Sequence, residues 1–408
     1  MNTLKIGVAG LGNAGQAILA CLPKLPQIKL GAVADIRASA VDAFRQKHGD
    51  VPAFDEVEKL CASHSVDAVW IATPHECHAR HVISAARQGK HIICEKPMAL
   101  TLQECDVMIE AARQSRVHLL LHSKVQDPPI RKIRQIVAGG KLGRLVQISS
   151  WNYKNWILQP RLEVEVDPER GGGVVYNQGP HHADVIRFIG GGLVKSVRAV
   201  TGKWDPHFDC EVGYTAFLQF QDGTPAVMSL NGYGYFNITE LTWGIGETGG
   251  KADPKAAPGL VRFHGPAQET ERYQDLQRRK GSRESGQKIY QPFFGQTIVS
   301  CERGDIRQSP DGLWVYSAAG REEISCPPFV DRAAPLLELH DALAHERSPF
   351  PDGAWGKASL EVVLAMLQSS REGREITLSH QTMAPPDDPT GWSGPNHTGT
   401  GPQTAAEK

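Results

Sequence analysis

Lys96 is the first residue of this sequence whose type and setting suit proton transfer. It lies in Glu95-Lys96-Pro97, directly after the apolar run His91 to Cys94, which is typical of a short buried strand. Proline fixes its own φ angle and favours extended backbone in the preceding residue, so Lys96 should be held at the carboxyl end of that strand. Ligands of open parallel sheets bind at this edge. Lys96 is therefore predicted to meet a substrate; the alternative interpretation is a surface Lys-Pro turn.

His181 is a second candidate for proton transfer, within the dense run from Gly171 to Asp184. The glycines at the start of this run permit close backbone approach, and His181 to Phe188 is predicted as a helix. A histidine at the start of a helix can move protons because its pKa lies near neutral pH. Taken alone, a histidine of the core or the surface is the competing interpretation.

A nucleotide-binding pattern opens the chain. The segment Gly10-Leu11-Gly12-Asn13-Ala14-Gly15 is G-x-G-x-x-G, after the β-prone run Leu4 to Ala9 and before a predicted helix over Gln16 to Leu22. The first glycine makes the turn, the second admits a pyrophosphate, and the third lets helix and strand pack closely. The helix N-terminus supplies N–H donors for phosphate. The predicted cofactor contacts here are Gly10, Gly12, Asn13, Ala14 and Gly15.

An acidic residue follows the next predicted strand, Lys29 to Ala34. Asp35 lies 20 positions after Gly15, where a carboxylate accepts hydrogen bonds from the adenosine ribose and repels a 2′-phosphate. NAD is therefore favoured over NADP. Arg37 leaves NADP open, because its guanidinium could bind a 2′-phosphate or stack on adenine. Asp35, Ile36 and Arg37 are all predicted to contact the cofactor.

Further cofactor contacts are expected at the ends of the neighbouring strands. A predicted strand over Asp67 to Ala72 runs into Thr73-Pro74-His75, and a helix is predicted over Glu76 to Gln88. The residues predicted here are Thr73, Pro74, His75, His78, Glu95 and Lys96. His75, His78 and His81 recur at a spacing that can mimic metal ligation. No carboxylate or cysteine pattern supports a metal site, and none is predicted.

The order of elements predicts two domains. Strand and helix patterns alternate up to His122, which predicts an α/β Rossmann domain, a doubly wound parallel sheet, over residues 1–124. Residues 125–380 are predicted as an α+β domain on a largely antiparallel open sheet. Its predicted strands are Leu145 to Asn152, Val194 to Thr201, Tyr214 to Gln221, Pro225 to Tyr233 and Leu313 to Ser317. Residues 246–286 are predicted as a surface excursion, and residues 381–408 as a disordered tail.

Composition argues against several classes of protein. The 408 residues carry 44 Lys and Arg against 45 Asp and Glu, so no overall charge attracts nucleic acid or an anionic membrane. No apolar run approaches the length of a membrane span. The first residues enter a strand pattern without a signal-peptide layout, and the eight cysteines contain no C-x-x-C pair. We therefore expect a cytoplasmic protein with no nucleic-acid or membrane partner.

Together these motifs resemble the Gfo/Idh/MocA oxidoreductases. The matching motifs are, in order, Gly10-x-Gly12-x-x-Gly15, Ala72-Thr73-Pro74 with His78, Glu95-Lys96-Pro97, and Gly172-Gly173 followed by Gly179-x-His181-x-x-Asp184. The resemblance covers residues 1 to 380. It implies an NAD-dependent dehydrogenase with a Rossmann domain and a C-terminal sheet whose open face forms a homodimer or homotetramer. It also implies Lys96 and His181 at a small-molecule substrate.

A narrower resemblance points to the phthalate 4,5-cis-dihydrodiol dehydrogenase branch of that family. It rests on Asn152-Tyr153, Pro160-Arg161, Gly171 to Val175, Ser196 to Trp204 and Ile298 to Asp305. It implies oxidation of a carboxylated aromatic cis-dihydrodiol to the corresponding catechol. Under this hypothesis Lys96 and His181 position the hydroxyl and move its proton, and either one serves as the base.

The carboxylate and the hydroxyls of such a substrate indicate which residues would bind it. Arg161 is the first candidate for the carboxylate because guanidinium binds it bidentately, and Lys154 and Lys124 come next. Asn177 stands where many sugar- or cyclitol-oxidising members carry Asp; an amide holds a hydroxyl but cannot accept its proton. The alternative hypotheses are a sugar or cyclitol dehydrogenase, and a nucleotide-binding regulator that has lost its chemistry.

Overall fold

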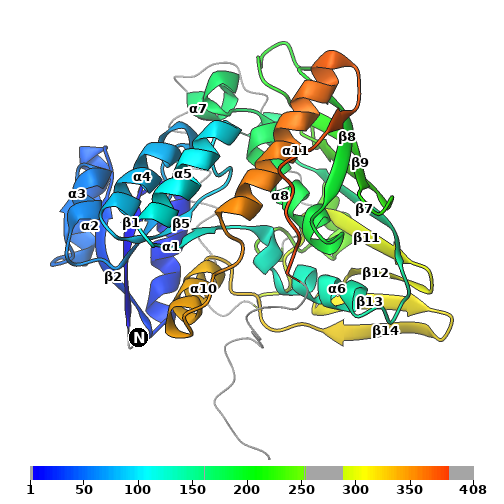
Figure 1. Ribbon diagram of the computed structural model, residues 1–408, viewed down its shortest axis with the longest axis horizontal. Coiled ribbons are helices and arrows are strands. Elements are labelled where there is room, and N and C mark those ends of the chain that lie inside the picture. The colour runs from blue at the N-terminus through cyan, green and yellow to red at the C-terminus, as the bar shows by residue number, and fades with distance from the viewer. Residues whose placement is uncertain (1–2, 160, 252, 254–287, 386–408) are drawn as a thin grey trace, which may run out of the picture.

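The computed structural model describes residues 3–159, 161–251, 253 and 288–385, which form two sheets with helices packed on them (Figure 1). The first sheet has six strands in the order β3-β2-β1-β4-β5-β6, and every neighbouring pair is parallel. This is the strand order of doubly wound nucleotide-binding domains. The predicted α/β fold class is confirmed.

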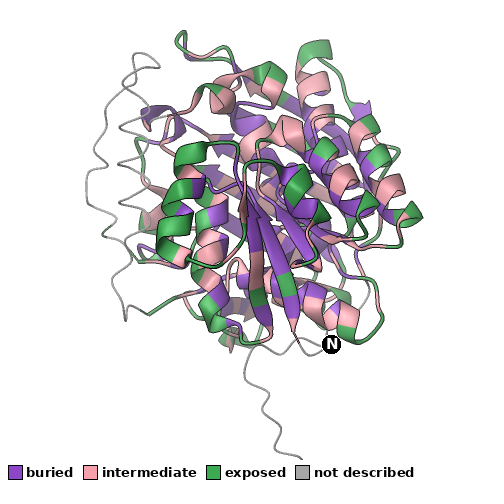
Figure 2. Ribbon diagram, turned by 90° about the vertical axis from the view of Figure 1, so that its left-hand side faces the viewer, coloured by how far each residue is buried: buried purple, intermediate pink, exposed green. Residues whose placement is uncertain are grey.

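The elements of the first sheet alternate as expected. Its strands are β1 (Leu4–Ala9), β2 (Ile28–Ala34), β3 (Ala53–Phe54), β4 (Ala68–Ile71), β5 (His91–Cys94) and β6 (Leu119–Leu121). Its helices are α1 (Asn13–Cys21), η1 (Leu22–Lys24), α2 (Ala38–His48), α3 (Val57–Ala62), η2 (His75–Cys77), α4 (His78–Arg87) and α5 (Leu102–Gln114). The strands are continuous apolar runs because helices cover both faces. Figure 2 shows these buried strands between helices whose outer sides are exposed.

The strand order reverses between β1 and β4, and this reversal fixes where a ligand binds. In such sheets the ligand lies beyond the carboxyl ends of the strands at the reversal. Gly10 follows β1, Ala72 and Thr73 follow β4, and Glu95 follows β5. The residues predicted for the cofactor therefore lie along one edge of the sheet.

The second sheet has nine strands in the order β14-β13-β12-β11-β7-β10-β9-β8-β15. All neighbouring pairs are antiparallel except β7 and β10, so the prediction of a largely antiparallel sheet is confirmed. Its strands are β7 (Leu145–Tyr153), β8 (Val194–Gly202), β9 (Gly213–Phe220), β10 (Pro225–Asn231), β11 (Gln296–Cys301), β12 (Gly304–Gln308), β13 (Gly312–Ser317), β14 (Gly320–Ser325) and β15 (Ile376–Thr377). The sequence prediction missed β11, β12, β14 and β15.

One face of this sheet is covered and the other is open. Along β10 every second residue is buried, which is the pattern of a strand with one face on a core. The cross-strand register places Phe217, Val227, Ser149 and Ile298 in one row on the opposite face. Phe217 and Ile298 are exposed there. The covered face carries the helices that reach the first sheet.

The remaining helices of the described chain begin and end as follows. They are η3 (Lys124–Gln126), α6 (Pro128–Ala138), η4 (Trp156–Leu158), α7 (Glu163–Val166), η5 (Pro168–Arg170), α8 (Val174–Ile189), η6 (Ile238–Thr242), α10 (Ala333–Ala344) and α11 (Gly353–Glu372). The predicted start of α8 at His181 is wrong. The helix begins directly after Gly173, which has a φ of 89°, and it continues through Pro180. His181 therefore lies in the middle of a helix.

The end of the chain returns to the first sheet. Leu336 and Leu339 of α10 share a core with Leu4 and Ile6 of β1. The Leu121 amide of β6 donates to the Pro351 carbonyl at 2.9 Å. The core of the first sheet is thus built from two separate parts of the sequence, and the division at residue 124 stays a prediction.

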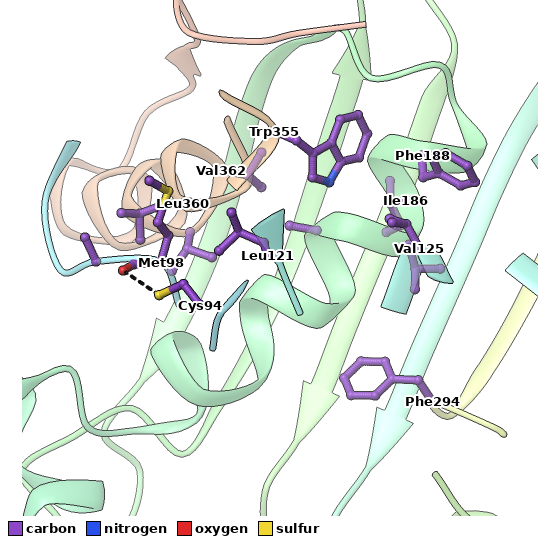
Figure 3. Packing of buried hydrophobic residues seen from close by; sticks show 14 of the residues in the cluster. Cys94, Met98, Leu121, Val125, Ile186, Phe188, Phe294, Trp355, Leu360 and Val362 are labelled. Carbon is purple, nitrogen blue, oxygen red and sulfur yellow. Dashed lines mark hydrogen bonds between the residues drawn. The ribbon is translucent and has the colours of Figure 1, made fainter. Parts of the chain in front are cut away.

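The molecule has two halves, the first sheet with its helices and the second sheet with its helices. Helix α11 packs these halves together through a shared apolar core. Met98 and Leu121 of the first half lie beside Leu360 of α11 (Figure 3). Gly356 allows this approach, because a Cβ at that position would lie 2.9 Å from the Leu121 side chain. The edge that carries Lys96 is consequently held against the second sheet.

A buried carboxylate strengthens this junction. Asp184 of α8 accepts hydrogen bonds from the hydroxyls of Ser123 and Ser359 and from Trp355 Nε1, the last at 2.9 Å. Asp184 is buried, and so are all three donors. It thus joins the chain after β6 to both α8 and α11. Asp184, the last residue of the Gly179-x-His181-x-x-Asp184 motif, therefore has a structural role.

Only parts of the two segments predicted to lack regular packing are described. Residues 252 and 254–286 of the predicted surface excursion and residues 386–408 of the predicted tail lie outside the described residues. The described part of the tail is packed. Gln381 accepts a hydrogen bond from Arg187 Nε at 2.8 Å, and Ala384 is buried.

Substituting Asp184 by alanine should destabilise the fold. The substitution leaves three buried donors without an acceptor, and each unsatisfied group costs about 1–3 kcal/mol. We expect the free energy of unfolding, measured by urea denaturation, to fall by about 3 kcal/mol or more. The control is Asp50→Ala at an exposed position, expected to change it by less than about 0.5 kcal/mol. A loss below about 1 kcal/mol for Asp184→Ala would contradict the role assigned to this carboxylate.

Candidate active site

The glycine loop has the geometry that a dinucleotide phosphate needs. Gly10 has a φ of +96°, and a Cβ there would lie 2.5 Å from the Ala72 carbonyl oxygen. A Cβ at Gly15 would lie 2.0 Å from the Gly10 carbonyl oxygen. A Cβ at Gly12, by contrast, would meet no atom within 4 Å, so this position opens onto free space at the start of α1. No side chain caps this helix, and its N-terminus is suited to a phosphate.

Asp35 and Arg37 form an ion pair beside this loop. The Leu11 amide donates to Asp35 Oδ2 at 2.7 Å, and Arg37 donates to both carboxylate oxygens, at 3.0 and 2.9 Å. Burial acts to raise the pKa of Asp35, but the hydrogen bonds from Arg37 and Leu11 outweigh it and lower that pKa. Ile36 between them is 90% exposed. An anionic carboxylate and an exposed apolar side chain at this place fit an adenosine.

The residues after β4 divide into two groups. His78 is fully buried, and its ring nitrogens lie 2.9 Å from the carbonyl oxygens of Pro97 and Thr73. The prediction that His78 contacts the cofactor gives way to a supporting role, because no part of its side chain is accessible. Thr73 and His75 are only partly buried and Pro74 is exposed, so their contact with the cofactor stays a prediction. Burial, followed by the charges of His78 and Lys96, lowers the pKa of His75 to about 3.

The histidine spacing does not assemble a metal site. His81 Nδ1 lies 2.9 Å from the Thr73 hydroxyl, while His78 bonds the two carbonyls. Within the described ranges of the chain, no group of three or more His, Cys, Asp or Glu side chains is arranged to hold a metal ion.

Lys96 projects from the end of β5 and reaches α8 of the other half. Its Nζ donates to the Asn177 carbonyl oxygen at 2.7 Å. Burial lowers its pKa from 10.5 to about 8; Glu95 opposes this shift, and the cations Lys154 and Arg332 add to it. A lysine with this pKa is partly an uncharged amine near neutral pH and can accept a proton.

Glu95 points to partners inside the protein. Its carboxylate accepts from Trp70 Nε1 at 3.3 Å and forms an ion pair with Arg332. Glu95 is buried, so it supports the loop that carries Lys96, and its predicted contact with the cofactor has no support in this geometry. The sequence prediction missed Arg332, which lies immediately before α10 and pairs with a residue 237 positions earlier.

His181 lies among cations on the covered face of the second sheet. Its ring packs against Phe294 at 5.5 Å between centroids, and its buried Nδ1 has no hydrogen-bond partner among the described residues. Burial, and then the charges of Lys96 and Lys124, hold the pKa of His181 well below its usual value. The imidazole is therefore neutral near pH 7.

Two lysines converge on Glu247, which the sequence prediction missed. Lys154 Nζ lies 2.7 Å from Glu247 Oε1 and 2.7 Å from Gln178 Oε1. Lys124 Nζ lies 3.3 Å from the Glu247 carbonyl oxygen and 3.3 Å from Asp127. Glu247 belongs to the stretch predicted as a surface excursion. A single carboxylate in a glycine-rich loop forms no local pattern that would have revealed it.

The side chains of Arg161 and Asn177 bond residues that are close to them in the sequence. The Arg161 guanidinium stacks on Trp156 at 4.5 Å, donates to the Trp156 carbonyl at 3.0 Å and lies 3.6 Å from Glu165. The side-chain oxygen of Asn177 accepts from Gln178, and its carbonyl accepts from Lys96. The structure thus brings together Lys96, His181, Lys124 and Lys154, and it shows Arg161 in contacts within its own segment.

Comparison with known proteins agrees with both halves of the fold. Residues 4–122 match an oxidoreductase family described as having an NAD-binding Rossmann fold, and residues 130–247 match the GFO/IDH/MocA C-terminal domain. The chain is 30% identical over 378 residues to 1-carboxy-3-chloro-3,4-dihydroxycyclohexa-1,5-diene dehydrogenase of Comamonas testosteroni, across 90% of this chain and 95% of the relative. The chain belongs to the Gfo/Idh/MocA oxidoreductase family.

Two further proteins are similar to this chain, one in sequence and one also in structure. Myo-inositol 2-dehydrogenase of Thermotoga maritima is 29% identical over 199 residues, which are 48% of this chain and 58% of the relative. A solved structure from Bordetella bronchiseptica RB50 is 35% identical, with a TM-score of 0.84, over 92% of this chain and all of that one. The Gfo/Idh/MocA protein described here is thus an NAD-binding oxidoreductase, and no described helix is long and apolar enough to cross a membrane.

Replacing Asp35 by asparagine should weaken NAD binding and reduce discrimination against NADP. The amide loses the charge that strengthens hydrogen bonds to the ribose and repels a 2′-phosphate. We expect about tenfold weaker NAD binding by calorimetry and a smaller ratio of NAD to NADP affinity. Asp55→Asn, at an exposed position on the same half, is the control. Unchanged affinities for both dinucleotides would show that Asp35 does not face the ribose.

Proposed function

We propose that this protein oxidises a carboxylated aromatic cis-dihydrodiol of the phthalate 4,5-dihydrodiol type to the corresponding catechol, with NAD as the hydride acceptor. The observation that carries the proposal is the group of cations around His181. Besides burial, the charges of Lys96, Lys124 and Lys154 lower the pKa of this histidine. A site with this electrostatic character favours a negatively charged substrate. The name of the Comamonas relative, a carboxylated dihydroxycyclohexadiene dehydrogenase, supports the same substrate class.

Lys96 is the base in this proposal. With a pKa of about 8 it is largely protonated at pH 7, and about one tenth of it is the free amine. The low pKa of His181 makes that imidazole a weaker proton acceptor, so it serves to hold the hydroxyl. The hydrogen bond from Lys96 to the Asn177 carbonyl fixes the amine between the two halves of the molecule.

The reaction balances with one proton and one hydride. NAD bound at the glycine loop would supply the acceptor for the hydride that leaves the carbinol carbon. Lys96 takes the hydroxyl proton, so the carbinol becomes a carbonyl within a hydroxy-enone. That product tautomerises to the aromatic catechol, and no further residue is needed as an acid or a base for the oxidation itself.

The substrate carboxylate is assigned to Lys124 and Lys154. The two side chains are 12% and 21% exposed, and they approach Glu247 from opposite halves of the fold. Burial raises the pKa of Asp127, the partner of Lys124, to about 6, although Lys124 acts to lower it. Arg161, ranked first from the sequence, falls behind because it already bonds Trp156 and Glu165.

Oxidation of a sugar or cyclitol is the second candidate. The resemblance to myo-inositol 2-dehydrogenase over about half of the chain favours it. Asn177 argues against a mechanism that needs an Asp at this position, and a neutral polyol has no carboxylate for Lys124 and Lys154 to bind. The predicted homodimer or homotetramer through the open sheet is also retained as a proposal. The exposed row with Phe217 and Ile298 supports it.

The oxidation rate should rise with pH and then level off. A base must be unprotonated to act, so kcat/KM should increase as pH passes through about 8 and remain constant above it. Lys96→Met should lower kcat by about 100- to 10 000-fold and abolish this rise. Initial rates of NADH formation across pH provide the measurement. A profile that rises instead near pH 6 would assign the base to another group.

The substrate class is tested with a matched pair of diols. We expect NADH formation from a 3,4-cis-dihydrodiol of benzoate, and little from the carboxamide of the same diol. Lys124→Gln and Lys154→Gln should each raise KM for the acid by about tenfold, as expected for loss of a charge-assisted contact, with little effect on the amide. Turnover of myo-inositol without turnover of any carboxylated dihydrodiol would favour the second candidate.

A further inference from the structure

Glu247 is a partly buried carboxylate at the site that the proposed mechanism does not use. Its Oε1 accepts from Lys154 Nζ at 2.7 Å and from Asn152 Nδ2 at 3.2 Å. Burial acts to raise its pKa, but Lys154 and Lys124 outweigh burial and lower it, so the group is ionised. An ionised carboxylate only accepts hydrogen bonds. No described residue hydrogen-bonds its Oε2, and a third of the side chain, 33%, is exposed.

The loop that carries Glu247 is fixed from both halves of the molecule. Lys124, after β6 of the first sheet, donates to the Glu247 carbonyl at 3.3 Å. The Phe293 amide donates to the Gly246 carbonyl at 3.2 Å. The position of the carboxylate is therefore set by several contacts beyond its ion pair with Lys154.

This loop is continuous with the residues assigned to catalysis. Phe294, next to the residue that binds the loop, packs against the His181 ring at 5.5 Å and lies 5.5 Å below Lys154 Nζ. The charge of Glu247 also acts on the pKa of Lys96. The free oxygen of Glu247 thus belongs to the same site as Lys96 and His181.

We infer that Glu247 is a specificity-determining residue that accepts a hydrogen bond from the second hydroxyl of a vicinal diol. One hydroxyl lies between Lys96 and His181 and is oxidised, and the neighbouring hydroxyl donates to Glu247 Oε2. Lys154 and Asn152 occupy Oε1 and hold the carboxylate in the orientation that this requires. The inference rests on the proposed function, because it takes the substrate to be a carboxylated diol.

The test compares the affinities of two product-like acids for the protein with NAD+ bound. Calorimetry with 3,4-dihydroxybenzoate and 3-hydroxybenzoate measures what the second hydroxyl contributes to binding. The wild type should prefer the dihydroxy acid by about tenfold, and Glu247→Gln should remove most of this preference, because a charge-assisted hydrogen bond is lost. Glu240→Gln, the same change at an exposed position, should leave the preference intact.

A second variant separates the hydroxyl contact from disruption of the site. Glu247→Asp keeps the charge beside Lys154 but shortens the side chain, so it should bind NAD+ normally and still lose the preference. If Glu247→Gln and Glu247→Asp both keep the wild-type preference, the inference is wrong while the proposed function stands. If the wild type binds neither acid, the proposed function fails, and this inference fails with it.

Discussion

The site depends on the withdrawal of one lysine amine from water at the junction of two sheets. Burial favours the uncharged amine, and the neighbouring cations act in the same direction, so the pKa of Lys96 falls to about 8. An exposed lysine would keep a pKa near 10.4 and would rarely be an unprotonated base at neutral pH. The end of β5 lies against α8, where the amine donates to the Asn177 carbonyl, and residues of α11 line the same pocket.

Much of the remaining structure serves to hold that junction. Asp184 joins the chain after β6 to α8 and α11, and Gly356 lets α11 approach Met98 and Leu121. Glu95 is neutralised by Arg332, which arrives from the returning C-terminal part of the chain. The domain that carries the glycine loop therefore receives part of its site from residues more than 200 positions away.

The sequence predicted the parts of the structure that local patterns specify. Alternating strands and helices predicted the first sheet, because right-handed βα units leave few possible topologies. The glycine loop and Lys96 were found because their roles depend on neighbours within a few residues. Glu247 and Arg332 were missed because each gains its role from partners far along the chain. The start of α8 was misplaced because the helix continues through Pro180, which usually marks a helix end.

In the proposed mechanism, Lys96 and His181 together hold the reacting hydroxyl of a carboxylated diol. A crystal structure of the protein with NAD+ and 3,4-dihydroxybenzoate would show whether they do. We expect one catechol oxygen within hydrogen-bonding distance of both Lys96 Nζ and the His181 ring, with the carboxylate near Lys124 and Lys154. A complex with the ring bound away from Lys96, or with the carboxylate paired with Lys96 itself, would show that the proposed mechanism is wrong.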